Sequence, residues 1–114
     1  MADLSLSVTR AKTGLFDLTV TEADGTTPQQ LHGTILYFHA SNGAISIDKN
    51  SPDNGITVTD ETDGLATLQI NPADTEGLGY GIYSMPCELT LVVGAAAYEV
   101  ARGNLTVSPN VGTP

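Results

Sequence analysis

The side chains best suited to chemistry in this sequence are two histidines and one cysteine. His32 lies in a polar segment, His39 ends an alternating segment, and Cys87 lies in the middle of an apolar row. Two histidines without a cysteine pair lack the spacing of a zinc site. For His39 we favour a half-buried structural histidine over a ligand or a base, and a buried thiol such as Cys87 is usually inert. We therefore predict no enzyme and no cofactor.

The middle of the chain is rich in acidic residues, whose carboxylate oxygens are the ligand type that calcium binds. They are Asp48, Asp53, Asp60, Glu61 and Asp63. An EF-hand loop needs oxygens at alternate positions, and a loop starting at Asp48 has Pro52 at its fifth position. We favour solvated loop acids, with a looser calcium site between loops as the alternative. The glycine-rich segment 77–81 precedes an expected strand, whereas a phosphate-binding loop opens a helix.

The charge balance restricts the partners. Thirteen acids against four bases give a formal net charge of −9, which repels nucleic-acid phosphates and anionic lipid headgroups. We predict no nucleic-acid partner and no membrane, since no segment approaches the roughly 20 apolar residues of a span. The acidic surface serves solubility in the simplest interpretation, or docking onto a basic partner in the sharper one. The N-terminus lacks a signal-peptide pattern and Cys87 is alone, so we expect synthesis in a reducing cytoplasm.

Alternation of apolar and polar residues with a period of two predicts strands throughout the chain. The alternating segments are 4–9, 16–21, 35–39, 44–47, 56–59, 65–70, 83–93 and 98–108. Segment 35–39 is apolar on both faces, which predicts a strand that is central or buried on both sides. Asn71 and Pro72 have the residue types of a helix cap and a first helical position, so a single helical turn is expected there.

Turn signals separate these segments. Asn42-Gly43 and Asp63-Gly64 predict tight turns because these residues tolerate positive φ. Pro86 cannot donate to a strand ladder, so it must face an edge or a bulge. The apolar parity shifts between Val100 and Leu105, and we assign the extra residue to a β-bulge at Arg102-Gly103.

These elements predict an all-β fold, an immunoglobulin-like antiparallel β-sandwich of about seven to eight strands. A chain of 114 residues has the usual size of one domain. We expect the sandwich to occupy residues 1–108. Residues 109–114 have no pattern and are expected to form a flexible C-terminal tail.

Several segments in a fixed order carry a resemblance to a known family. They are Leu31–Phe38 (LHGTILYF), Gly55–Leu68 (GITVTDETDGLATL), Pro72–Thr75 (PADT), Gly81–Tyr83 (GIY) and Arg102–Pro109 (RGNLTVSP). Together they resemble the small immunoglobulin-like virion proteins of tailed bacteriophages, and they are similar to the N-terminal domain of phage baseplate upper proteins. The pattern departs at Ser84–Pro86, where relatives carry a second aromatic residue and an acid.

The resemblance implies a virion structural protein that decorates the head or attaches to the tail, baseplate or fibre. Its implied partners are other phage virion proteins, and it is implied to assemble in the host bacterial cytoplasm; a homo-oligomer stays open. Sheet edges offer strand addition as a way of docking. We expect partner contacts at Arg102, Gly103, Pro109, Asn110 and Val111. The alternative is a carbohydrate- or cell-surface-binding module, for which Tyr80 and Tyr98 are the candidate aromatic residues.

Overall fold

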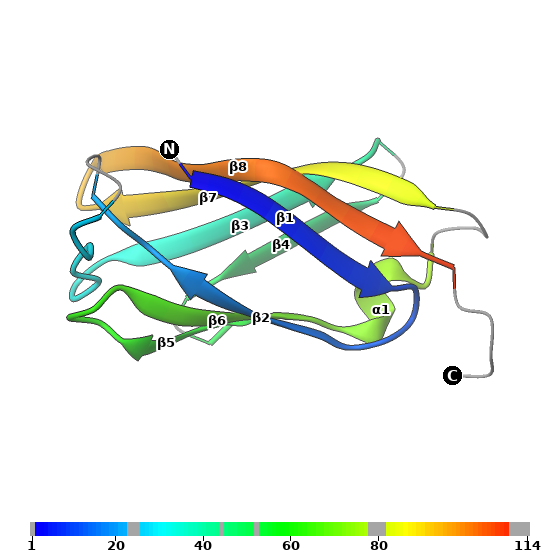
Figure 1. The fold of residues 1–114 in the computed structure, drawn as a ribbon, viewed down its shortest axis with the longest axis horizontal. Coiled ribbons are helices and arrows are strands. Elements are labelled where there is room, and N and C mark those ends of the chain that lie inside the picture. The colour runs from blue at the N-terminus through cyan, green and yellow to red at the C-terminus, as the bar shows by residue number, and fades with distance from the viewer. Residues whose placement is uncertain (1, 23–25, 44, 52, 78–81, 110–114) are drawn as a thin grey trace.

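In the residues that the structure describes, the alternating segments form eight strands in two facing sheets (Figure 1). The structure is a computed structural model, and it describes the chain except residues 1, 23–25, 44, 52, 78–81 and 110–114. In chain order the elements are β1 (Ala2–Thr9), β2 (Gly14–Thr19), β3 (Ile35–Ser41), β4 (Ser46–Asn50), β5 (Ile56–Asp60), β6 (Leu65–Ile70), α1 (Pro72–Thr75), β7 (Tyr83–Val93) and β8 (Ala96–Ser108).

The strand order is that of an immunoglobulin-like sandwich. One sheet has five strands in the order β1-β8-β7-β3-β4, and the other has three in the order β2-β6-β5. In the immunoglobulin fold, strands C, F and G lie in one sheet and strands B, E and D in the other. Here β3, β7 and β8 take the places of C, F and G, and β2, β6 and β5 those of B, E and D. β4 extends the larger sheet. The predicted fold class is confirmed.

One strand pair departs from the antiparallel expectation. β1 runs parallel to β8, from Ala2 opposite Ala101 to Thr9 opposite Ser108. The connection after β1 carries the chain into the opposite sheet, so β1 cannot form a hairpin with its successor β2. Its inward side chains are buried instead by pairing with the edge of β8, whose direction is the same.

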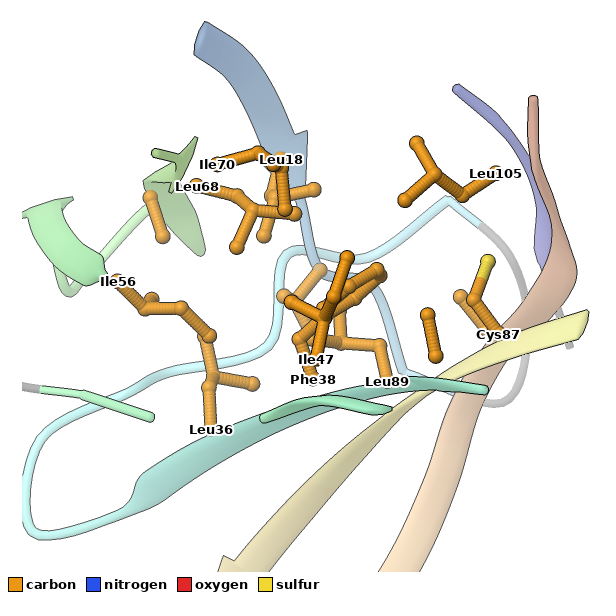
Figure 2. Packing of buried hydrophobic residues seen from close by; sticks show 14 of the residues in the cluster. Leu18, Leu36, Phe38, Ile47, Ile56, Leu68, Ile70, Cys87, Leu89 and Leu105 are labelled. Carbon is orange, nitrogen blue, oxygen red and sulfur yellow. The ribbon is translucent and has the colours of Figure 1, made fainter. Parts of the chain in front are cut away.

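The core lies between the apolar faces of the two sheets. Figure 2 shows Phe38 and Ile47 of the larger sheet directed toward Leu68 and Ile70 of the smaller one. β3 lies inside its sheet, as predicted, but it is buried on one face only: Phe38 is 1% exposed, whereas Ile35 and Tyr37 are 38% and 43% exposed. Of the two predicted alternatives, the central position is confirmed, whereas burial on both faces is not found. Among the described elements, α1 is the only helix and has four residues, too short to cover a sheet.

The predicted turns are confirmed in place, and the positive φ in each is at the glycine. Gly43, in the β3–β4 connection, has φ +88°, and Gly64, in the β5–β6 hairpin, has φ +71°. The β7–β8 turn is shorter than the sequence indicated, since β8 already begins at Ala96. Pairing of β7 with β3 ends at Cys87 opposite Ala40, so Pro86 lies where β7 has only β8 beside it, as its missing donor requires.

The bulge in β8 lies two residues before its predicted position. Leu89 pairs with Ala101 and Thr90 with Glu99, so Val100 is the extra residue. Arg102 and Gly103 are in regular register, and the prediction of a bulge there is wrong. Glycine is needed at 103 for another reason, because a Cβ there would overlap the carbonyl oxygen of Leu4 on β1. A glycine inside a strand signals either a bulge or a close backbone approach, and the sequence did not distinguish the two.

α1 closes one end of the sandwich. The predicted single helical turn after Asn71 is present, and Asp74 Oδ2 accepts a hydrogen bond from the Asn71 amide at 2.7 Å. Thr75 is fully buried, and its Oγ1 accepts a hydrogen bond from the Ala11 amide at 2.9 Å. Lys49, 7% exposed on β4, places Nζ 2.8 Å from Asp74 Oδ2. No helix in the described part of the chain has the length and hydropathy needed to cross a membrane.

Candidate interaction surface

A row of charged residues crosses the outer face of the larger sheet. Asp48 on β4 lies opposite His39 on β3, His39 opposite Glu88 on β7, and Glu88 opposite Arg102 on β8. Directly opposed residues share a face, with Cβ atoms about 5 Å apart. The four residues therefore form one line across four strands, which we call the charged row.

Hydrogen bonds orient the ends of the charged row. His39 Nδ1 lies 2.6 Å from Asp48 Oδ1. Arg102 donates from Nε to Glu99 Oε1 at 2.7 Å and from Nη2 to Glu99 Oε2 at 3.1 Å. The hydrogen bond and the charge of Glu99, together with the charge of Glu88, raise the pKa of the Arg102 guanidinium. These side chains are solvated, so the pairs organise the surface more than they stabilise the fold.

A shallow hollow adjoins the charged row where β3 and β7 separate. It has a volume of ≈ 490 Å³ and is lined by His39, Ser41, Pro86, Cys87, Glu88, Arg102, Gly103 and Asn104. The last paired residues of the two strands, Ala40 and Cys87, lie at its margin. The hollow therefore combines both signs of charge with neutral polar and apolar groups.

An apolar band lies beside the charged row on the same face. It consists of Ile35, Tyr37 and Val92, of which Ile35 and Val92 lie directly opposite each other. Ile35 and Tyr37 are exposed and Val92 is half-buried, and contiguous apolar patches with a polar rim mark interaction sites. This band was not predicted, because apolar residues on both faces of β3 were interpreted as the sign of a strand that is central or buried on both sides. One signal in the sequence could have indicated an exposed outer face. The sequence predicts only one short helical turn, and a single turn is too short to cover the outside of a sheet.

The predicted partner-binding residues fall into two places. Arg102 is exposed in the charged row, whereas Gly103 pairs with Cys87 on the core side and lies against β1. Pro109 directly follows β8, at the end of the sandwich that holds α1 (Figure 1). A strand rises about 3.3 Å per residue, so Pro109 and Arg102 belong to separate surfaces. Asn110 and Val111 lie outside the described residues.

Two of the candidate groups for chemistry, Cys87 and His32, differ in burial in the described chain. Cys87 is 4% exposed, and burial raises the pKa of its thiol, which disfavours the reactive thiolate. His32 is exposed, with Nδ1 3.4 Å from Glu61 Oε1, and is not part of the charged row. Among the described residues, no three His, Cys, Asp or Glu side chains come together as a metal site requires.

A second hollow lies on the smaller sheet. It has a volume of ≈ 260 Å³ and is lined by Asp53, Gly55, Thr57, Thr67, Gln69 and Asn71. Gln69 Nε2 donates to Asn71 Oδ1 at 2.7 Å, which fixes one wall. The aromatic candidates for sugar binding lie elsewhere: Tyr98 is on β8 and 56% exposed, and Tyr80 lies outside the described residues.

Strand order and surface together define the class of the protein as an immunoglobulin-like β-sandwich whose outer face no described element covers. Known protein-family models give no match to the chain, and curated protein sequences give none either. Its function is therefore inferred from its own surface and from the segments that resemble the phage family.

Proposed function

We propose that the protein is a non-catalytic structural component of a tailed-bacteriophage virion. It decorates the head or attaches to the tail, baseplate or fibre through contacts with other virion proteins. The observation that supports this most directly is the outer face of the larger sheet, where the apolar band and the charged row lie side by side. In the described chain no element covers this face.

The segments that resemble the phage family have definite places in the sandwich. Leu31–Phe38 leads into β3, Gly55–Leu68 contains the β5–β6 hairpin, and the segment beginning at Arg102 forms the end of β8. Gly64 and Gly103 are required there by a positive φ and by a close backbone approach. Since the fold alone demands these glycines, support for a phage protein comes from the order of the segments along one chain.

The electrostatics favour a basic receptor. The formal net charge of −9 gives a surface that attracts basic protein faces and accelerates their encounter. In the charged row, Asp48 and Glu88 outnumber the one permanent cation, Arg102. We therefore assign the main contact to the apolar band with the charged row, including Arg102 and the adjacent Gly103, and a second contact to Pro109, Asn110 and Val111.

Localisation in purified virions tests this proposal. We expect mass spectrometry to detect the protein in virions purified from the source bacterium, and immunogold labelling to place it on separated heads or on separated tails. Recombinant protein should rebind virions stripped of it, and Tyr37→Ala or Arg102→Ala should weaken rebinding, whereas Thr57→Ala on the other sheet should not. A protein abundant in the lysate and absent from purified virions contradicts the proposal.

The polar hollow on the smaller sheet supports one alternative, a carbohydrate- or cell-surface-binding module. Asp53, Gln69 and Asn71 offer donors and acceptors of the kind that sugar hydroxyls use. A glycan array distinguishes the two functions. The virion proposal expects no specific binding, whereas a hit that is lost in Gln69→Ala and kept in Tyr37→Ala favours the alternative.

A further inference from the structure

The four edge strands in the described part of the chain differ in how they are protected. β1 and β4 are the edges of the larger sheet, and β2 and β5 those of the smaller one. An edge strand presents unpaired N–H and C=O groups to other chains. Proteins limit unwanted pairing with short strands, charged side chains and bulges.

Three of these edges carry such protection. β4 has five residues and turns Lys49 inward, where it pairs with Asp74. β5 has five residues and a register shift between Val58 and Asp60. β2 has six residues and exposes Asp17 in its middle.

β1 has fewer of these devices than the other three edges. It is the longest of the four edge strands, with eight residues, and it pairs with β8 without a register shift. It contains no proline, and its one charged residue, Asp3, lies at its beginning. Leu4 and Leu6 pack against the core but keep part of their surface exposed. A further strand beside β1 would complete their burial.

The direction of the free backbone groups of β1 follows from its pairing. The Arg10 amide donates to Ser108 O at 2.9 Å, and the Leu4 backbone approaches Gly103. In a parallel pair, alternate residues of a strand bond to the same neighbour. Even-numbered residues of β1 therefore bond to β8, and the N–H and C=O groups of Ser5 and Ser7 point away from the sheet.

We propose that β1 is a self-association edge, at which β1 of a second copy adds in antiparallel orientation about a two-fold axis through Leu6. In this register Leu4 lies opposite Val8, Ser5 opposite Ser7, and Asp3 opposite Thr9. The alternation keeps apolar residues on the core side of both copies, and no like charges meet. The two larger sheets become one continuous sheet with an isologous interface.

A second copy fits this edge better than an unrelated strand because β1 is complementary to itself in this register. The edge carries one charged residue, Asp3, in a protein of net charge −9, so two copies repel each other less there than at a surface crowded with acids. This inference is independent of the proposed function, because it concerns a sheet edge and not the outer face.

Sedimentation equilibrium over a range of protein and salt concentrations tests the proposal. We expect reversible dimers. Added salt should strengthen them, because it screens the repulsion between the two negatively charged copies; the screening length is about 8 Å at physiological ionic strength. Ser7→Pro removes an outward donor and leaves the bonds to β8 in place. The double variant Ser5→Lys/Ser7→Lys puts like charges opposite each other across the two-fold axis.

Both β1 variants should dimerise at least about tenfold more weakly, with circular dichroism and melting curves confirming that they fold. The matched control, Thr19→Lys/Thr57→Lys, adds the same charge to the edges of the smaller sheet and should dimerise like the unmodified protein. If Ser7→Pro does not fold, the double variant Ser5→Lys/Ser7→Lys alone tests the proposal. A protein that stays monomeric at every concentration and salt overturns the proposal, and so does a dimer that the β1 variants leave unchanged or the control weakens equally.

Discussion

The two faces of β3 share one backbone and differ in nearly everything else. On the inner face Leu36, Phe38 and Ala40 are 0–1% exposed, whereas Ile35 and Tyr37 on the outer face are 38% and 43% exposed. The inner side chains fill the space between the sheets, and the outer ones face away from the core. Alternate positions of one strand therefore separate the core from the proposed contact surface. Substitutions one residue apart can test this separation.

The largest expected effect is on the inner face. Phe38→Ala should lower the free energy of unfolding by about 3–5 kcal/mol, because it removes a buried ring and leaves a cavity. Tyr37→Ala, one position earlier on the outer face, should lower it by less than about 1 kcal/mol. Urea denaturation measures both. Similar losses from the two substitutions would contradict the separation of the faces.

The second test compares an ion pair at the closed end of the core with one on the outer face. Lys49→Met keeps an apolar stem but leaves the Asp74 carboxylate without its partner. Breaking a buried pair costs about 3–5 kcal/mol, and Asp74, whose side chain is 22% exposed, is still partly solvated. We therefore expect a loss of about 2 kcal/mol in denaturant unfolding. Arg102→Met removes an exposed pair and should leave the unfolding midpoint unchanged; an equal loss there would refute the comparison.

The third test concerns the backbone contact that joins β1 to β8. Gly103→Ala places a methyl group on the Leu4 carbonyl, and overpacking of this kind costs about 1–3 kcal/mol. We expect faster hydrogen exchange of the β1 amides along with this loss. Gly77→Ala is the control, because its Cβ would meet Ile45 Cγ2 at an ordinary 3.7 Å. Unchanged exchange in β1 would show that the overlap is relieved elsewhere.

Gly103 also shows what the sequence could predict and what it could not. Period-two alternation, Asn42-Gly43, Asp63-Gly64 and Asn71-Pro72 are local signals, and the elements that they predicted are present. The parity shift of β8 is also local, but it located the extra residue only to within a few positions. The parallel placement of β1 depends on which sheet the next strand enters, and no local pattern records that choice.

The candidate surface was harder to predict than the fold for the same reason. Asp48, His39, Glu88 and Arg102 come from four strands, and only the pairing register aligns them. Of these residues only Arg102 was predicted to be a contact. The reason was a β-bulge expected at Arg102-Gly103, and the extra residue is Val100 instead. It treated His39 as structural and Asp48 as a loop acid. Register between distant strands follows from burial of the whole core, so a single sequence gives little information on it.

The fourth test compares two threonines, one at the closed end of the core and one on an outer face. Thr75→Val removes the hydroxyl that accepts from the Ala11 amide and leaves that donor unsatisfied, at a cost of about 1–2 kcal/mol. Thr57→Val on the exposed face of β5 should change the free energy of unfolding by less than about 0.5 kcal/mol. Thermal unfolding of the two variants, which have the same change in composition, measures the difference. A null result for Thr75→Val would mean that water or another group takes over the Ala11 donor.

The smallest energetic effect concerns Cys87 on the inner face of β7. Its thiol pKa is raised by burial, so the folded state holds the proton to a higher pH than the unfolded state does. Stability is then unaffected below the unfolded thiol pKa of about 8.5 and declines slightly as the pH rises above it. Iodoacetamide at neutral pH should modify Cys87 only as fast as the protein opens. Ser84→Cys in a Cys87→Ala background puts a thiol on the outer face of the same strand and should react like a free thiol. Equal rates for the two thiols would mean that β7 opens readily and that its two faces are not distinct environments.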